Sequence, residues 1–290
     1  MNNTFVTVTW NNQNQIEGLI QSIQKYEPES LIVVVDNNSN DETVKRAEKY
    51  KNVKVIKLDK NVGFSAANNK AMIYVKTKYV TFINPDTRLL SRISSKLSKD
   101  LTNSKVDLIG VKLQNSNGTL QPSIFKFQTP FEIIIEQFGL GKFLPEVLKR
   151  KWSPENSRHN QKILVDWLVG AFYFTETKSF VDVGGFSEEY FLYAEDMDFC
   201  YKYKLQGKRV LFEPSISIEH IGGTSEEKTS SSKNLKLLKS FSIFAKKYNL
   251  TKNILTLYIC YKIKRNIFFF VDKKRANKYR DNVNYLKGQL

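Results

Sequence analysis

The first 84 residues alternate between two hydrophobic patterns, and this alternation restricts the fold more than any other feature. Helical signals occupy residues 15–26, 37–50 and 65–76. Apolar runs typical of buried strands precede, separate and follow them, at residues 5–10, 31–36, 53–59 and 79–84. Four strands separated by helices predict a parallel sheet with helices packed on its faces, which is an α/β fold.

Polar, small and aromatic residues come directly after these strands. They are Trp10, Asn11, Asp36, Asn37, Asn38, Asn61, Val62, Gly63, Asp86 and Thr87. In a parallel sheet, the carboxyl ends of the strands form the edge at which ligands bind. The sequence therefore predicts a binding site along this edge.

Basic residues are concentrated at the end of the chain. Residues 228–290 contain 16 Lys and Arg and 2 Asp, a net charge of +14, whereas residues 1–227 contain 29 basic and 27 acidic residues. We therefore expect two domains, 1–227 and a basic helical extension, 228–290. Leu, Ile and Phe mixed with Lys and Arg are typical of helices that lie on an anionic membrane surface. The alternatives are that these helices pack on the core of the first domain or against a second copy in a homodimer. No motif for nucleic acid accompanies the charge, so that partner is not expected.

The cellular location is inferred from three missing features: a disulfide framework, a secretory signal and a membrane-spanning run. Cys200 and Cys260 are the two cysteines, too few for a disulfide framework and without the spacing of a cysteine zinc site. MNNTFVTVTW has no secretory pattern, and no run of 18 apolar residues occurs. We expect a cytoplasmic protein, peripheral on the inner face of the cell membrane.

Three carboxylates fall within four residues at the start of a helix expected over residues 194–206. They are Glu195, Asp196 and Asp198 in the stretch YAEDMDF. Helix capping alone is one interpretation, because a helix start stabilises negative charge. The density of the cluster, just after Gly184-Gly185 and several aromatic residues, favours a general base.

Six motifs occur in an order that resembles the family 2 glycosyltransferases, and most of all their rhamnosyltransferase-like members, which build bacterial surface polysaccharides. They are VVVDNNSND, NVGFSAANN, FINPDT, WLVGAFYF, GGFSEEYFLYAEDMDF and GKRVLFEPSISIEHIGG, and the resemblance covers residues 4–225. It implies the nucleotide-sugar-binding GT-A fold, a mixed sheet flanked by helices. It also implies transfer of a sugar, with inversion, from a nucleoside diphosphate to an acceptor hydroxyl.

The resemblance also implies roles for single residues. Asp196 is expected to be the general base, and Asp36 to bind the base or ribose of the donor. Further contacts with the donor nucleotide are expected from Thr9, Trp10, Asn38, Asn61, Gly63, Asn68, Asn84 and Asp86. Contacts with the acceptor or the sugar are expected from Trp167, Gly170, Glu195 and Asp198.

Several of these roles have a structural alternative. Asp36 suits an Asx-turn before the next helix. Trp10 and Trp167 suit core packing, and Asn68 suits the surface of a helix. Glu195 and Asp198 are expected either to orient acceptor hydroxyls or to hold the helix start.

A divalent cation is expected at Asp86, because the family binds the donor diphosphate through Mn²⁺ or Mg²⁺. Many members have a second aspartate where this chain has Asn84. Such a cation takes few protein ligands and completes its shell with diphosphate oxygens and water. His220 in IEHIGG is the expected second ligand, and a hydrogen-bonded core histidine is its alternative. An imidazole ligand favours Mn²⁺.

The sequence therefore predicts an inverting glycosyltransferase of cell-surface polysaccharide synthesis. The donor is expected to be a UDP- or dTDP-sugar, with rhamnose the sugar indicated, and the acceptor a glycan or lipid-linked glycan. A nucleotidyltransferase is one rival, but TWNNQNQIEG lacks the Gly-rich basic loop of those enzymes. A non-catalytic, membrane-associated binding module is the other.

Overall fold

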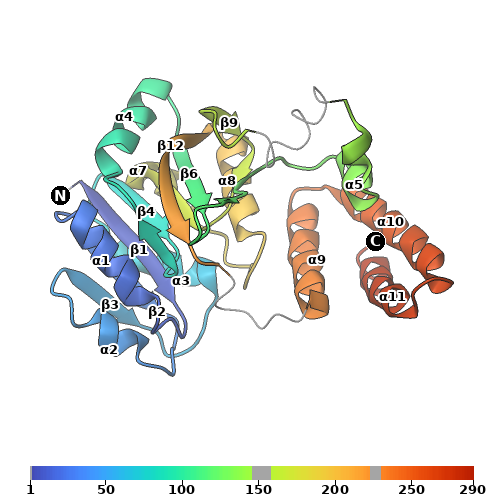
Figure 1. The fold of residues 1–290 in the computed structure, drawn as a ribbon, viewed down its shortest axis with the longest axis horizontal. Helices are drawn as coiled ribbons and strands as arrows, with labels where there is room; N and C mark the ends of the chain where they lie inside the picture. The colour runs from blue at the N-terminus through green and yellow to red at the C-terminus, as the bar shows by residue number, and fades with distance from the viewer. Residues whose placement is uncertain (1, 146–157, 223–229) are drawn as a thin grey trace. The chain divides into compact units, whose positions relative to one another are not determined.

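Figure 1 shows the chain as a computed structural model that describes residues 2–145, 158–222 and 230–290. The chain forms two compact units. The first, here the sheet unit, comprises Met1–Phe125, Glu155–Phe191 and Glu195–Glu227. The second, here the helical unit, comprises Lys126–Pro154, Leu192–Ala194 and Lys228–Leu290.

The four strands expected in the first 84 residues form one half of a large sheet. They are β1 (Asn3–Thr9), β2 (Leu31–Asp36), β3 (Val53–Lys57) and β4 (Tyr79–Ile83). They pair in parallel in the order β3-β2-β1-β4. β1, β2 and β4 are almost wholly buried, as their continuous apolar runs predict.

The other half of the sheet adds antiparallel pairs. Its main strands are β11 (Phe172–Glu176), β6 (Leu108–Gln114), β12 (Val210–His220) and β5 (Thr87–Leu89), in the order β4-β11-β6-β12-β5. The short strands β7 (Leu120–Gln121) and β9 (Ile163–Val165) pair with β6 and β12. β8 (Ile124–Phe125) and β10 (Trp167–Leu168) form a separate two-stranded sheet. The mixed sheet confirms the expected fold class.

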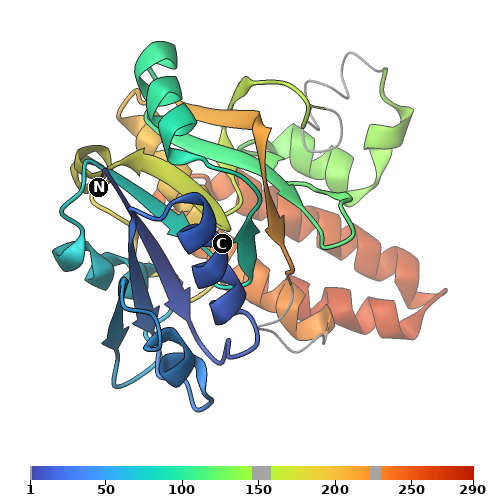
Figure 2. The ribbon, with the colours of Figure 1, turned by 60° about the vertical axis from the view of Figure 1, so that its left-hand side comes forward.

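Helices cover the sheet where apolar residues line one side. In α1 (Ile16–Tyr26), Ile16, Leu19, Ile20 and Ile23 are buried in the main core, and α1 lies beside β5 (Figure 2). The other helices of this unit are α2 (Thr43–Ala47), α3 (Phe64–Ala71), α4 (Ser94–Ser104), α7 (Thr177–Asp182) and α8 (Glu195–Leu205). α3 gives way to a 3-10 turn, Met72–Tyr74, instead of continuing to residue 76.

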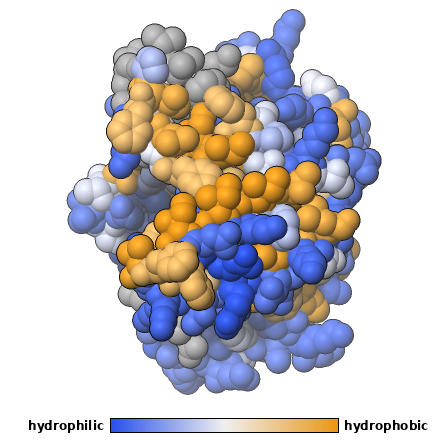
Figure 3. Space-filling model, turned by 90° about the vertical axis from the view of Figure 1, so that its right-hand side faces the viewer, coloured by the Kyte–Doolittle hydropathy of each residue, from blue (hydrophilic) through white to orange (hydrophobic). Residues whose placement is uncertain are grey.

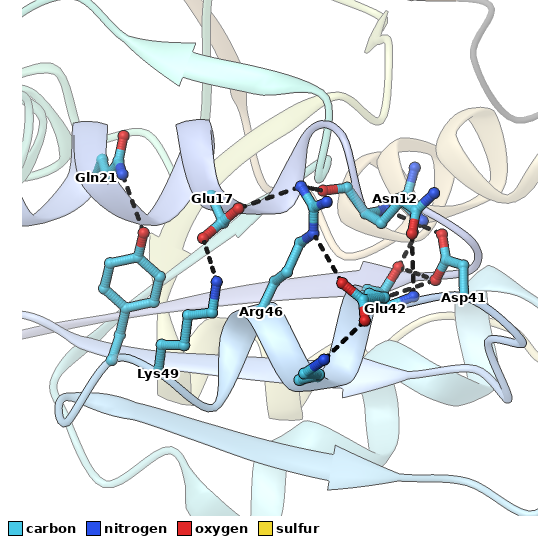
Figure 4. Close-up of polar contacts among 11 residues, drawn as sticks. Asn12, Glu17, Gln21, Asp41, Glu42, Arg46 and Lys49 are labelled. Atoms are coloured by element: carbon cyan, nitrogen blue, oxygen red, sulfur yellow. Dashed lines mark hydrogen bonds and ion pairs between the residues drawn. The ribbon is translucent and has the colours of Figure 1, made fainter.

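A network of polar contacts joins the start of α1 to α2 (Figure 4). Arg46 lies between Glu17, 3.3 Å from its Nη1, and the backbone oxygen of Gln13, which accepts a hydrogen bond at 2.9 Å. The backbone N–H of Gln13 in turn donates to Asp41 at 3.1 Å. These contacts hold the loop after β1 against the loop after β2, the neighbouring strand of the sheet.

The helical unit is built from α5 (Pro130–Gln137), α9 (Ser230–Lys247), α10 (Thr251–Phe269) and α11 (Lys273–Lys287), with a 3-10 turn, Leu140–Phe143. Thr129 and Glu132 form a capping box that starts α5. A small core joins α5 to the later helices and contains Ile133, Leu238, Ala245, Ile254, Leu257 and Leu286. Within the described residues, no helix combines the length and hydrophobicity needed to cross a membrane.

Candidate active site

The edge of the sheet holds Asp36 in a dense set of hydrogen bonds. Its Oδ1 accepts from Thr9 Oγ1 at 3.1 Å and from Ser39 Oγ at 2.5 Å, and its Oδ2 accepts from the Ser39 N–H at 2.9 Å. This is the turn expected as the structural alternative. Since a carboxylate offers about four acceptor positions, the turn still leaves capacity for one donor from a ligand.

Trp10 lies next to this turn and is 43 % exposed, so core packing is excluded for its side chain. Its loop is tied to the turn, because the Asn11 N–H donates to Ser39 Oγ at 2.9 Å and the Asn40 N–H to Asn11 Oδ1 at 2.8 Å. Asn38 has a φ of 66°, a left-handed conformation that asparagine tolerates. An exposed aromatic ring beside Asp36 has the form of a nucleobase contact.

The loop after β3 is joined to the same edge through Asn37, which sequence reasoning left without a role. Asn37 donates to Asn61 Oδ1 at 2.8 Å and accepts from the Val62 N–H at 2.8 Å. Gly63 has a φ of 83°, and a Cβ there would lie 2.7 Å from the backbone oxygen of Phe191. Only glycine therefore fits where this loop meets the segment that precedes α8.

The last two asparagines of NVGFSAANN, Asn68 and Asn69, make hydrogen bonds within the sheet unit. Asn68 is 1 % exposed and donates to the Phe64 backbone oxygen at 3.0 Å, so it is not the surface residue expected as its alternative. Asn69 donates to the Phe186 oxygen at 2.8 Å and accepts from the Phe186 N–H at 3.0 Å. Asn69 thereby fastens the GGFS turn to α3.

Asp86 and His220 meet, although 134 positions separate them in the sequence. His220 Nε2 lies 3.3 Å from Asp86 Oδ1, and both residues are buried. The contact follows from the antiparallel pairing of β5 with β12, in which Thr87 is the partner of His220. The same segment supplies the Gly222 N–H, which donates to Asp86 Oδ2 at 3.2 Å.

Gln121 fixes the His220 ring from its other side. Its Oε1 lies 2.6 Å from His220 Nδ1, so Nδ1 carries a hydrogen and donates it. With the ring held in this way, Nε2 faces Asp86 Oδ1. Two acceptors at 3.3 Å repel unless a cation, either a proton or a metal ion, lies with them.

These residues fit a divalent cation of the expected kind. Two ligands at right angles on an octahedral ion, with bonds of about 2.1 Å, are roughly 3.0 Å apart, close to the separation of Nε2 and Oδ1. Ligating histidines also commonly donate their other N–H to a fixed acceptor. The described residues contain no group of three or more His, Cys, Asp or Glu side chains suited to a metal, so most ligands would come from diphosphate and water.

Asn84 contributes to this corner through its backbone. Its N–H donates to the Ala171 oxygen at 3.1 Å, and its own oxygen accepts from Thr87 Oγ1 at 2.7 Å. These contacts shape the turn of FINPDT, so that Asp86 leaves β4 toward β12.

Asp196 and Glu195 begin α8 in different surroundings. Burial raises the pKa of Asp196 to about 6, opposed by hydrogen bonds from the backbone N–H groups of Met197 and Gly170. Burial, and then the charge of Asp196, raise the pKa of Glu195 to about 8. Among the described side chains, Glu195 Oε2 is a buried atom without a hydrogen-bond partner. Near pH 7, Asp196 is therefore ionised and Glu195 neutral.

Asp198 is fully buried at 0 % exposure. Its Oδ2 accepts from Ser187 Oγ at 2.5 Å and its Oδ1 from the Tyr190 hydroxyl at 3.1 Å. These contacts favour the second of its two expected roles, because they hold the preceding turn against the start of α8.

The base candidate and the metal candidate lie at one end of the β4–β11 pair. Phe172 is the partner of Ile83, and the next pair outward is Ala171 with Asn84. Gly170 follows, and a Cβ on it would lie 3.4 Å from the Cβ of Asp196. Asp196 thus lies against the turn that leads into β11, one residue beyond the Ala171–Asn84 pair.

Trp167 lies on the small second sheet. Its ring stacks on Phe125 with centroids 4.6 Å apart, and its side chain is half-buried. The ring therefore packs against the sheet unit while part of its surface reaches solvent.

Gln121 is the functional candidate that the sequence did not indicate. It lies on a two-residue strand that pairs with β6, opposite Leu113, and Leu113 also pairs with Ile218 of β12. A two-residue strand gives no periodic signal, so only the pairing of three strands reveals that Gln121 reaches His220.

Comparison with known proteins shows which family and which relatives the chain is similar to. Residues 4–138 match the family described as glycosyl transferase family 2. The rhamnosyltransferase WbbL of Escherichia coli is 27 % identical over 227 residues, 74 % of this chain and 81 % of that protein. The N-acetylglucosaminyl-diphospho-decaprenol L-rhamnosyltransferase of Mycobacterium tuberculosis is 24 % identical over 235 residues, 74 % of each chain.

A similar fold occurs in the crystal structure of GalNAc-T7 with UDP, GalNAc and Mn²⁺. Its TM-score is 0.61 at 15 % identity, over 85 % of this chain and 48 % of that one, so this chain spans about half of its length. This likeness concerns the fold, and it supports the GT-A architecture. Residues 4–138 therefore form a glycosyl transferase family 2 domain, and the chain is similar to rhamnosyltransferases over about three quarters of its length.

Proposed function

We propose that the protein is an inverting transferase of cell-surface polysaccharide synthesis. It moves a sugar from a pyrimidine nucleoside diphosphate to a hydroxyl group of a glycan or lipid-linked glycan. The observation that carries this proposal is the contact of Asp196 with Gly170, one residue beyond the Ala171–Asn84 pair that leads to Asp86. A base and a candidate cation site at the same end of the β4–β11 pair suit the two ends of a displacement reaction.

Inversion needs a base on the face of the sugar opposite the leaving diphosphate. Asp196 suits this role, since its pKa of about 6 leaves it ionised at neutral pH yet basic enough to accept a proton. Glu195, neutral under the same conditions, acts as a hydrogen-bond donor beside it. Two adjacent carboxyl groups with separated pKa values divide these tasks.

The diphosphate is proposed to lie at Asp86 and His220, with Gln121 orienting the imidazole. A bound Mn²⁺ or Mg²⁺ would offset the negative charge that grows on the leaving group. His220 favours Mn²⁺ as the natural ion. The GalNAc-T7 structure, which contains both UDP and Mn²⁺, supports a nucleotide with a divalent ion in this fold.

The donor nucleotide is proposed to extend from that corner along the sheet edge. Asp36 accepts the N3–H of uracil or thymine, and the exposed Trp10 ring stacks on the base. Rhamnose is the sugar proposed, because two relatives are named as rhamnosyltransferases. The acceptor is proposed to carry a lipid diphosphate, as the name of the mycobacterial relative indicates for that enzyme. Such an acceptor would keep the protein at the inner face of the cell membrane.

A panel of nucleotide sugars tests the proposal directly. The full chain with Mn²⁺ is incubated with dTDP-rhamnose, UDP-GlcNAc, UDP-glucose and GDP-mannose, and both hydrolysis and thermal shift are measured. We expect a response to one pyrimidine sugar, lost when EDTA removes the metal. A response limited to GDP-mannose, or one unaffected by EDTA, would overturn the donor or the metal assignment.

A further inference from the structure

An exposed row of aliphatic side chains runs along α10. Leu255, Ile259, Ile263 and Ile267 are spaced four residues apart and are 45, 46, 43 and 55 % exposed. Side chains at this spacing lie one above the other on a helix. The buried residues of the same helix, such as Ile254 and Leu257, face the core of the helical unit instead. The helix is therefore apolar on two sides, of which one packs and the other is open.

The row continues into a strongly apolar end. Phe269, Phe270 and Val271 follow it directly and are 61, 87 and 78 % exposed. The neighbouring α5 segment, which packs with α10, adds Phe131 at 56 % and Phe143 at 76 %. Figure 3 shows hydrophobic side chains gathered in a broad band on the side of the molecule where α5 and α10 lie. An apolar surface of this extent marks a docking site.

Positive charge borders the row. At 100° per residue, Lys252 and Lys262 fall on the same face of α10 as Ile259, and both are exposed. The turn after Val271 leads into Lys273 and Lys274 of α11, also exposed. Residues 228–290 as a whole carry 16 basic and 2 acidic residues. This charge identifies the occupant, because a second copy of the same surface would bring like charges together, whereas anionic lipid complements them.

We propose that the α10 row and the Phe269–Val271 end insert side by side into the headgroup boundary of an anionic bilayer. The helix would lie in the plane of the membrane, as amphipathic interfacial helices do, with its lysines at the lipid phosphates. This inference rests on the proposed function only for the identity of the membrane. It gives that function a physical means of meeting a lipid-linked acceptor.

The test compares two variants of the full chain in co-sedimentation with vesicles. The first carries Ile259→Ser, Ile263→Ser and Ile267→Ser, and the control carries Ile73→Ser and Val181→Ser, which remove exposed apolar residues of the sheet unit at 66 and 62 % exposure. Vesicles contain phosphatidylcholine with about 30 % phosphatidylglycerol, to supply the negative surface potential. Circular dichroism confirms that both variants fold.

We expect the row variant to lose at least about tenfold in partitioning, since each buried methylene contributes to interfacial binding. The control should match the wild type, and salt should weaken binding of both. Equal sedimentation of the row variant and the wild type would overturn the proposal. The proposal would also be overturned if light scattering showed a dimer for the wild type and a monomer for the row variant, and neither protein bound vesicles.

Donor hydrolysis, measured without vesicles on the same preparations, reports on the transferase separately. The row variant should hydrolyse the sugar donor at the wild-type rate, because its substitutions lie outside the sheet unit. Vesicle binding by a wild type that turns over no donor would support the docking surface and count against the proposed function alone.

Discussion

Two pairs of titratable side chains lie at one end of β4 and β11, and they are built in opposite ways. Asp86 and His220 face each other at 3.3 Å, and Gly222 and Gln121 hold them from outside. Glu195 and Asp196 are sequence neighbours, and Glu195 keeps a buried oxygen without a partner in the described structure. The first pair has the surroundings that a bound cation needs. The second has the low polarity that raises a carboxyl pKa, so it is suited to accept a proton.

Replacement of Asp196 tests the role of the second pair with the largest expected effect. We expect Asp196→Asn to reduce sugar transfer by about a thousandfold, the contribution of a general base, because an amide accepts no proton. Steady-state transfer assays measure the loss, and isothermal titration should show donor binding unchanged. Asp182→Asn, an acid exposed on α7, is the matched control and should keep full activity. Turnover of Asp196→Asn within tenfold of the wild type would refute the assignment.

His220→Ala tests the other pair. Loss of a ligand should weaken Mn²⁺ binding on the order of a hundredfold, at or above the cost of losing an outer-shell partner. Titration followed by the electron paramagnetic resonance of free Mn²⁺ gives the affinity. The control is His159→Gln, since His159 accepts from the Ser123 N–H at 3.0 Å and a glutamine oxygen can replace that contact. An unchanged Mn²⁺ affinity would return His220 to a purely structural role.

Gln121→Leu tests whether Gln121 orients the His220 ring. Without the oxygen 2.6 Å from Nδ1, the ring loses its fixed orientation, and Mn²⁺ affinity should fall about tenfold. Gln121→Glu keeps an acceptor and should restore or strengthen binding. If leucine and glutamate behave alike, the contact does not orient the ring.

The pH dependence of transfer distinguishes the two carboxyl groups of α8. A base must be ionised, so the rate rises with pH through its pKa, about 6 for Asp196 and about 8 for Glu195. We expect the rate under subsaturating substrate to fall about tenfold per pH unit below that point. The acid limb should therefore lie near pH 6 and remain there in Glu195→Gln.

Stability provides an independent control on Glu195. Its folded pKa lies above its ordinary value of 4.5, so the native state binds more protons and stability falls as pH rises from about 4.5 to about 8. Urea titrations at several pH values should show this fall flattened above pH 6 in Glu195→Gln. In the transfer assay, an acid limb of the rate near pH 8 in the wild type that disappears in Glu195→Gln would make Glu195 the base.

The sequence predicted the regular part of the fold because long apolar runs and helical spacing are local signals. Strands β1 to β4 and helices α1 and α8 follow their patterns closely. β5 was not predicted, because a three-residue strand carries no period. α5 was expected in the first domain, but Ile133 packs with α9, α10 and α11 because its partners are chosen by tertiary packing.

The site residues, too, were predicted only where a local sequence pattern marks them. Motifs indicated Asp86, His220 and Asp196 as candidates, because each follows a strand or starts a helix. The sequence did not tell which side-chain atoms are already hydrogen-bonded; these contacts exclude a surface position for Asn68 and favour a structural role for Asp198. Gln121 and Gly222 reach Asp86 and His220 only through strand pairing, so they needed the structure.

We propose that one carboxylate and one imidazole, those of Asp86 and His220, hold the ion that binds the donor diphosphate. Pulsed electron paramagnetic resonance of Mn²⁺ bound to the protein with UDP measures this directly, because a coordinated imidazole adds nitrogen modulation to the signal. We expect nitrogen modulation in the wild type and in His159→Gln, and its loss in His220→Ala. Modulation that is absent from the wild type, or that persists in His220→Ala, would contradict it.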